Sequence, residues 1–249
     1  MEIISLGWGV QSFTLVAMSA LGELPMVDAA IHADTTHERM DTYNFAAKVT
    51  PWLESKGVRV VTVRDEKAAA EVLNQNRKNL YAPFHTSNGG QLFRQCTDRW
   101  KVRPIHRWVR AELKARGDKS AIQWMGISWD EVQRVKQSHV KYITNRYPLI
   151  ERRMTRADCE KWLSDRGLPI PPKSACVFCP FHSNSAWRTL SDGDRLRAIQ
   201  VDEAIRHARP GLLTYAASAR RPLVEVFEAH DLQPDLFNAV DECSGHCFV

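Results

Sequence analysis

Short apolar runs alternate with longer mixed stretches through the first half of the chain. Four runs have the length and residue types of buried strands: the run that begins at Met1, and residues 27–33, 58–63 and 121–127. The stretches between them have helical length and mix polar with apolar residues. Strands that alternate with helices form a mainly parallel sheet covered on both faces. We therefore predict an α/β fold with helices on both faces of the sheet.

The pattern changes after residue 147. A helix over residues 155–167, capped by Thr155 and Asp158, precedes a proline-rich loop at 168–183 and helices over 191–208 and 223–230. We therefore expect an α/β domain at residues 1–150. Residues 151–249 form a helical C-terminal region with a cysteine-rich loop and a cysteine-containing tail.

A glycine turn follows the first strand. Gly7 and Gly9 relax the backbone there, and Ser12 adds a hydroxyl where a helix-like run begins. Backbone N–H groups at such a turn and at a helix N-terminus bind phosphates. The turn has neither the lysine of the Walker loop nor the spacing of the dinucleotide motif, so ordinary loop chemistry is the alternative.

Polar or glycine-rich segments also follow two later strands, at Asp34–Thr35 and Gly126–Glu131. Because the carboxyl ends of parallel strands share one rim, these segments and the glycine turn are expected to meet there. Asp34 and Thr35 can equally serve as the cap of the next helix. His32 and His37 beside them are interpreted as structural histidines.

Composition and charge limit the class of protein and the partners that we expect. The 249 residues are 44% hydrophobic, which is enough for a core. No window approaches the roughly 18 apolar residues of a membrane span, and the N-terminus lacks a secretory pattern, so we expect a cytoplasmic protein. The net charge of +5 favours polyanionic partners. Arginines and lysines crowd residues 94–116 and 146–156, where they either line a groove for tRNA or DNA or form a solvated helix face.

Six cysteines without a secretory signal indicate metal or redox chemistry rather than a disulfide framework. One interpretation is an iron–sulfur cluster on Cys96, Cys176 and Cys179, with a fourth ligand from another cysteine, His182 or exogenous sulfur. A second is a zinc ion on Cys176, Cys179, His182 and one of Cys243, His246 or Cys247 in the tail. The third leaves the thiols unligated. Cys159, inside a predicted helix, is interpreted as a packing residue.

The chain resembles the phosphoadenosine-phosphosulfate (PAPS) reductase family of the adenine nucleotide α-hydrolase, or PP-loop, superfamily. Six segments carry the resemblance, in order: Ser5–Ser12 (SLGWGVQS), His32–Glu38 with Thr42 and Tyr43, Cys96–Pro104 (CTDRWKVRP), Gly126–Glu131 with Arg134, Tyr147–Ile150, and Glu242–His246 (ECSGH). They span nearly the whole chain.

The resemblance implies a five-stranded sheet on which residues 1–150 bind ATP, PAPS or adenosine phosphosulfate (APS), with Mg²⁺. It implies that Cys243 is a nucleophile and that Gln11 and Lys101 belong to the catalytic machinery. The nucleotide-binding residues carried over are Ser5, Gly7, Trp8, Gly9, Val10, Gln11, Ser12, Asp34, Thr35, Gly126, Ser128 and Arg134. Trp8 is a candidate lid or stacking residue.

The chain departs from the family at three places. Gln11 replaces the loop aspartate, which weakens the assignment of magnesium to the loop itself. Gln95–Cys96 replaces an adjacent cysteine pair, so three of the four cluster ligands match. Cys247 is an addition to the terminal motif, and it can form a redox pair with Cys243 or bind metal.

The leading hypothesis is an ATP pyrophosphatase that acts at the α-phosphate in a sulfur-transfer or nucleic-acid-modification pathway. One alternative is a PAPS or APS reductase that releases sulfite, with Cys243 as the nucleophile. Another is a non-catalytic nucleotide-binding module of a nucleic-acid-targeting system. The partners expected are an adenine nucleotide, tRNA or DNA, and a sulfur-donor protein or thioredoxin, and the protein is compatible with a dimer.

Overall fold

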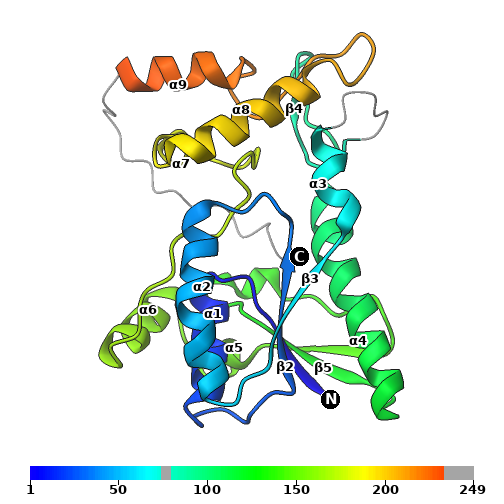
Figure 1. Ribbon diagram of the computed structural model, residues 1–249, viewed down its shortest axis with the longest axis vertical. Coiled ribbons are helices and arrows are strands. Elements are labelled where there is room, and N and C mark those ends of the chain that lie inside the picture. The colour runs from blue at the N-terminus through cyan, green and yellow to red at the C-terminus, as the bar shows by residue number, and fades with distance from the viewer. Residues whose placement is uncertain (74–79, 233–249) are drawn as a thin grey trace.

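A five-stranded, all-parallel sheet organises the computed structural model, which describes residues 1–73 and 80–232. The strand order is β3-β2-β1-β5-β6 (Figure 1). The strands are β1 (Glu2–Ser5), β2 (Ala29–Asp34), β3 (Val60–Arg64), β5 (Ala121–Met125) and β6 (Ile143–Arg146). The predicted α/β class with a parallel five-stranded sheet is confirmed.

Helices cover both faces of this sheet. One face packs on α1 (Val10–Ala20), α2 (Met40–Ser55) and α6 (Arg156–Asp165), and the other on α4 (Arg103–Arg116). Successive residues of β1 point to opposite faces, because Ile4 lies in the first of these apolar clusters and Ile3 in the second. Burial on both faces explains why the strands are continuous apolar runs rather than alternating ones.

A third apolar cluster lies beyond the carboxyl ends of the strands. It joins residues 80–84 to residues 177–227 and includes Trp100, Phe178 and Trp187. Its elements occupy the upper part of Figure 1. They are α3 (Glu66–Leu73), the antiparallel pair β4 (His85–Thr86) and β7 (Thr214–Tyr215), α7 (Asn184–Arg188), α8 (Asp192–Arg206) and α9 (Leu223–Leu232).

Several local predictions are confirmed. Thr155 caps α6, and the Asp158 side chain completes the capping box. Ser191 caps α8, α9 begins at the expected Leu223, and residues 168–183 contain no helix. Sequence reasoning did not locate β6 or the β4–β7 pair, which are four and two residues long and carry too few positions for a periodic signal.

The expected boundary at residue 150 does not coincide with a boundary between apolar clusters. Cys159, Trp162 and Leu163 of α6 pack in the same cluster as α1, whereas Leu80 and Phe84 pack with residues 177–227. Cys159 is fully buried, as its interpretation as a packing residue requires, and burial raises the pKa of its thiol to about 12. No helix among the described residues has the length and apolar character needed to cross a membrane.

Candidate nucleotide and thiol site

The turn between β1 and α1 leads into a buried helix. Trp8 adopts a positive φ of 57°, an uncommon conformation for a residue other than glycine. Gly9 is the N-cap of α1 and supplies no side-chain hydrogen bond to it, and the first turn contains no acidic residue. The first N–H groups of an α-helix have no partner within the helix. The turn therefore offers backbone donors at the positive end of a helix dipole.

Ser12 holds the turn closed from the inside. Its hydroxyl donates to the Gly9 carbonyl and accepts from the Gly7 N–H, both at 3.2 Å. Ser174, in the proline-rich loop, donates to the Gly7 carbonyl at 2.7 Å. The side chain of Trp8 is 2% exposed and packs in the core, with its ring 6.0 Å from that of His32. Trp8 thus contributes backbone rather than an exposed ring to this site.

The loop after β5 lies directly against this turn. A Cβ atom at Gly126 would stand 2.7 Å from the backbone nitrogen of Ser12, so only glycine allows the approach. The order in which strands are added to the sheet reverses between β1 and β5, since β2 and β3 lie on one side of β1 and β5 and β6 lie on the other. Ligands of doubly wound sheets bind at this switch point, beyond the carboxyl ends of the strands.

Gln11 connects the turn to the loop after β5. Its amide nitrogen donates to the Glu131 carboxylate at 3.2 Å and lies 3.4 Å from the Ser128 hydroxyl. Arg134 forms an ion pair with the same carboxylate at 2.7 Å, and Arg156 reaches the Gln11 carbonyl oxygen at 3.5 Å. Glu131 is therefore the carboxylate that the structure brings to Gln11.

Asp34 ends β2 at the same rim. Burial opposes its ionisation, but donors from the Thr36 N–H, the Tyr43 hydroxyl and the Arg64 guanidinium outweigh burial and hold the pKa of this carboxyl below its ordinary value. Desolvation by the same environment, with the Asp34 carboxylate nearby, raises the pKa of Tyr43. Asp34 is thus a fixed negative charge, and its acceptor capacity is largely used within the protein.

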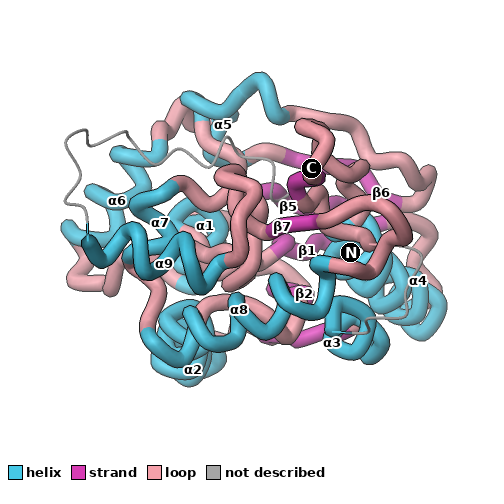
Figure 2. The backbone as a smooth tube through the Cα atoms, turned by 90° about the horizontal axis from the view of Figure 1, so that it is seen from above, coloured by secondary structure: helices cyan, strands magenta, loops and turns pink. Residues whose placement is uncertain are grey.

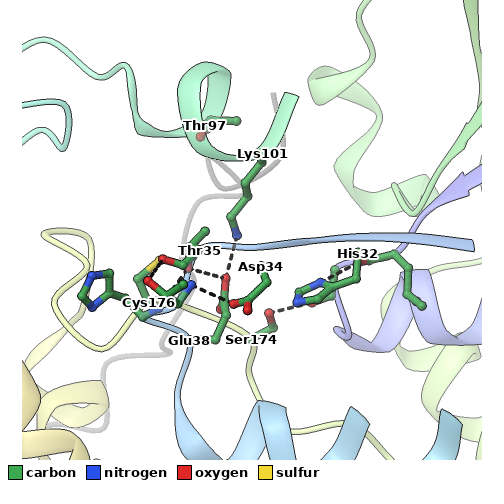
Figure 3. Close-up of polar contacts among 12 residues, drawn as sticks. His32, Asp34, Thr35, Glu38, Thr97, Lys101, Ser174 and Cys176 are labelled. Carbon is green, nitrogen blue, oxygen red and sulfur yellow. Dashed lines mark hydrogen bonds and ion pairs between the residues drawn. The ribbon is translucent and has the colours of Figure 1, made fainter. Parts of the chain in front are cut away.

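A buried polar chain links β2 to the cysteine loop (Figure 3). The Thr35 hydroxyl donates to Glu38 at 3.3 Å and lies 3.4 Å from the sulfur of Cys176. Lys101 donates to the same oxygen of Glu38 at 3.1 Å. The other oxygen of Glu38, which is 1% exposed, has no hydrogen-bond partner among the described residues. Glu38 and its ion pair with Lys101 were not anticipated from the sequence.

The three cysteines assigned to a metal or cluster line one small cavity of about 40 Å³. Thr35 and Lys101 border it as well. Burial and the Glu38 carboxylate raise the pKa of the Cys176 thiol. The cavity thus joins Cys96, from before α4, to Cys176 and Cys179, about 80 positions further along the chain.

Within residues 1–73 and 80–232, no three His, Cys, Asp or Glu side chains are grouped to hold a metal ion. The volume of the cavity approximates one or two water molecules, so a four-iron cluster requires the lining to move apart. In the described part of the chain, His182 is not one of the residues that line the cavity. Its Nε2 lies 2.9 Å from the Cys176 carbonyl oxygen, and its ring packs on Trp187.

The remaining predicted residues fall into two groups. His32 is buried, and burial lowers its pKa, while its Nδ1 lies 3.1 Å from the Leu6 carbonyl oxygen, which is consistent with a structural role. Cys243, His246 and Cys247 lie outside the described residues. Neither protein-family models nor curated proteins match this chain.

Proposed function

We propose that this protein is an adenine-nucleotide α-hydrolase, an ATP pyrophosphatase of PAPS reductase-like type that serves sulfur transfer or nucleic-acid modification. One observation carries the proposal: the Gly7–Ser12 turn and the Gly126 loop meet at the switch point of the sheet, within backbone contact of each other. This is the position and the donor geometry that a nucleotide phosphate chain requires.

In this proposal the N–H groups at the start of α1 hold the phosphates, and Asp34–Thr35 border the adenosine. Lys101, which is paired with Glu38, supplies a positive charge beside the cysteine-lined cavity. Mg²⁺ prefers carboxylate and phosphate oxygens, and Glu131 is the carboxylate that reaches the turn through Gln11. The ion, when bound with the nucleotide, supplies charge neutralisation at the phosphates.

The cysteine-lined cavity supports a sulfur-handling role. Cys96 and Cys176 are free thiols, and Cys179 lines the same cavity. Thiolates suit both an iron–sulfur cluster and zinc, so the cofactor stays a prediction. Iron, sulfide and zinc analysis after anaerobic purification tests it: matched iron and sulfide supports a cluster, and stoichiometric zinc supports a structural knuckle.

The substitution Gly9→Ala tests the nucleotide site. A Cβ at Gly9 meets nothing within 4 Å and the residue has φ −87°, so the fold tolerates alanine, whereas a phosphate approaching the turn does not. We expect ATP binding, measured by titration calorimetry, to weaken at least tenfold, and pyrophosphate release to fall with it. The matched control is Gly193→Ala in α8, which also has open space around its Cβ.

Unchanged ATP affinity in Gly9→Ala would overturn the proposed site. If the wild-type protein binds nucleotide and releases sulfite from PAPS or APS instead of pyrophosphate from ATP, the reaction is sulfonucleotide reduction with Cys243 as the nucleophile. Nucleotide binding without either product would identify a non-catalytic module.

A further inference from the structure

A second concave surface, the basic groove, lies on the far side of Asp34 from the phosphate turn. It has a volume of about 750 Å³ and runs between the end of β3, the start of α3 and the outer face of α4. Two acidic residues, Asp65 and Glu66, also line it. Its basic side chains are Arg64, Lys67, Arg99, Arg103, Arg107 and Arg110.

Helical spacing places three of these cations in a row. Arg103, Arg107 and Arg110 are separated by four and three positions, so they share one face of α4. At 1.5 Å per residue the row extends about 10 Å along the helix. Arg64 and Lys67 line the same groove, and the Asp65–Arg107 ion pair joins their segment to α4. The groove therefore carries cations from two separate elements.

The carboxylates beside the groove position these arginines without masking them. Arg103 pairs with Asp98 and Arg107 pairs with Asp65, yet the two arginine side chains remain 61% and 65% exposed. Exposed pairs of this kind contribute about 0–1 kcal/mol, so a phosphate can compete for the guanidinium. Arg99 is different, because Glu71 binds it in a bidentate fashion and its guanidinium stacks on Tyr81. These contacts thus hold the Arg99 side chain in place at the edge of the groove.

We propose that the basic groove binds the phosphodiester backbone of a nucleic acid. Five of its six cations are arginines, whose planar guanidinium groups match phosphate oxygens in pairs. The groove also opens at the candidate site, since Arg64 pairs with Asp34 at the end of β2. This inference rests on the proposed function in one respect: for an ATP pyrophosphatase, the groove identifies the substrate that is modified as a nucleic acid. Binding to the groove itself does not depend on nucleotide hydrolysis.

The test is salt-dependent binding of a fluorescein-labelled 20-mer, as single-stranded DNA and as duplex, by fluorescence anisotropy without ATP. The double variant Arg107→Glu/Arg110→Glu is expected to weaken binding at least tenfold. It is also expected to reduce the slope of log affinity against log salt by about two. Arg110→Ala is an exposed single change that preserves the fold and is expected to reduce the slope by about one.

The matched control is Lys48→Glu/Lys56→Glu, which makes the same charge change at two exposed positions, one in the middle of α2 and one directly after its end, on the opposite face of the sheet from α4 (Figure 1). Its affinity for the 20-mer is expected to fall far less. Equal loss in both double variants would indicate a general charge effect and would overturn the groove. Absence of 20-mer binding at 50 mM salt would also overturn it. If poly-glutamate binds more tightly than the 20-mer, the groove would be assigned to acidic proteins instead. These assays contain no nucleotide, so their outcome is separate from that of Gly9→Ala.

Discussion

The Gly7–Ser12 turn and the cavity lined by Cys96, Cys176 and Cys179 are neighbours, but they are built in different ways. The turn uses backbone groups of a short segment, Gly7–Ser12, closed by the hydroxyl of Ser12 within that segment. The cavity uses side chains from just after β2, from just before α4 and from the proline-rich loop, which lie up to about 140 positions apart. Figure 2 views the fold from above, with α8 beside α2 and α3. The turn is a local structure, and the cavity exists only when the third apolar cluster has packed.

The buried charge pair beneath the cavity is the feature with the largest expected effect. Lys101→Met leaves Glu38, which is 1% exposed, as an unpaired buried carboxylate. We expect a loss of about 3 kcal/mol in the free energy of unfolding, measured by urea denaturation. The double variant Lys101→Met/Glu38→Gln should recover part of that loss.

Lys161→Met is the control for this prediction, because its partner Asp165 is exposed and the pair contributes little. An equally small effect of Lys101→Met would mean that the cavity does not depend on the buried pair.

The second largest loss of stability is expected at the contact between the Gly7–Ser12 turn and the loop after β5. Gly126→Ala forces a methyl group against the Ser12 backbone, which cannot rotate away as a flexible side chain can. We expect a loss of about 1–3 kcal/mol in the free energy of unfolding, together with weaker ATP binding. Gly193→Ala meets no neighbour and should be neutral. Full stability of Gly126→Ala would contradict the close approach of the loops.

The smallest effect is expected where the two regions meet. Ser174→Ala removes the 2.7 Å hydrogen bond from the proline-rich loop to the Gly7 carbonyl. A single hydrogen bond of this kind contributes about 1 kcal/mol, so the melting temperature should fall by a few degrees. Ser174→Thr keeps the hydroxyl and should restore most of the loss. If alanine and threonine behave alike, the bond does not couple the turn to the cysteine loop.

Much of the fold could be predicted because its signals are local. Thr155 and Asp158 form the capping box that their three-residue spacing predicts, and the apolar run at residues 58–63 overlaps β3. The parallel sheet followed from alternation of strand and helix, and the gathering of three loops at one rim followed from the parallel sheet. The short strand β6 and the β4–β7 pair were missed because two to four residues carry no period.

From the sequence alone, four of the five strands of the main sheet, the starts of α6, α8 and α9 and the residue types at the rim could be predicted, since these depend on spacing within a few turns of chain. The glycines before α1 are one such local feature. The tertiary structure decided which distant side chains touch: Lys101 on Glu38, Thr35 beside Cys176, and the row of arginines on α4 facing Arg64. It also turned Trp8 into the core, away from the ligand side. The physical reason is that such contacts depend on how separate apolar faces pack, and packing is a property of the whole chain rather than of any segment.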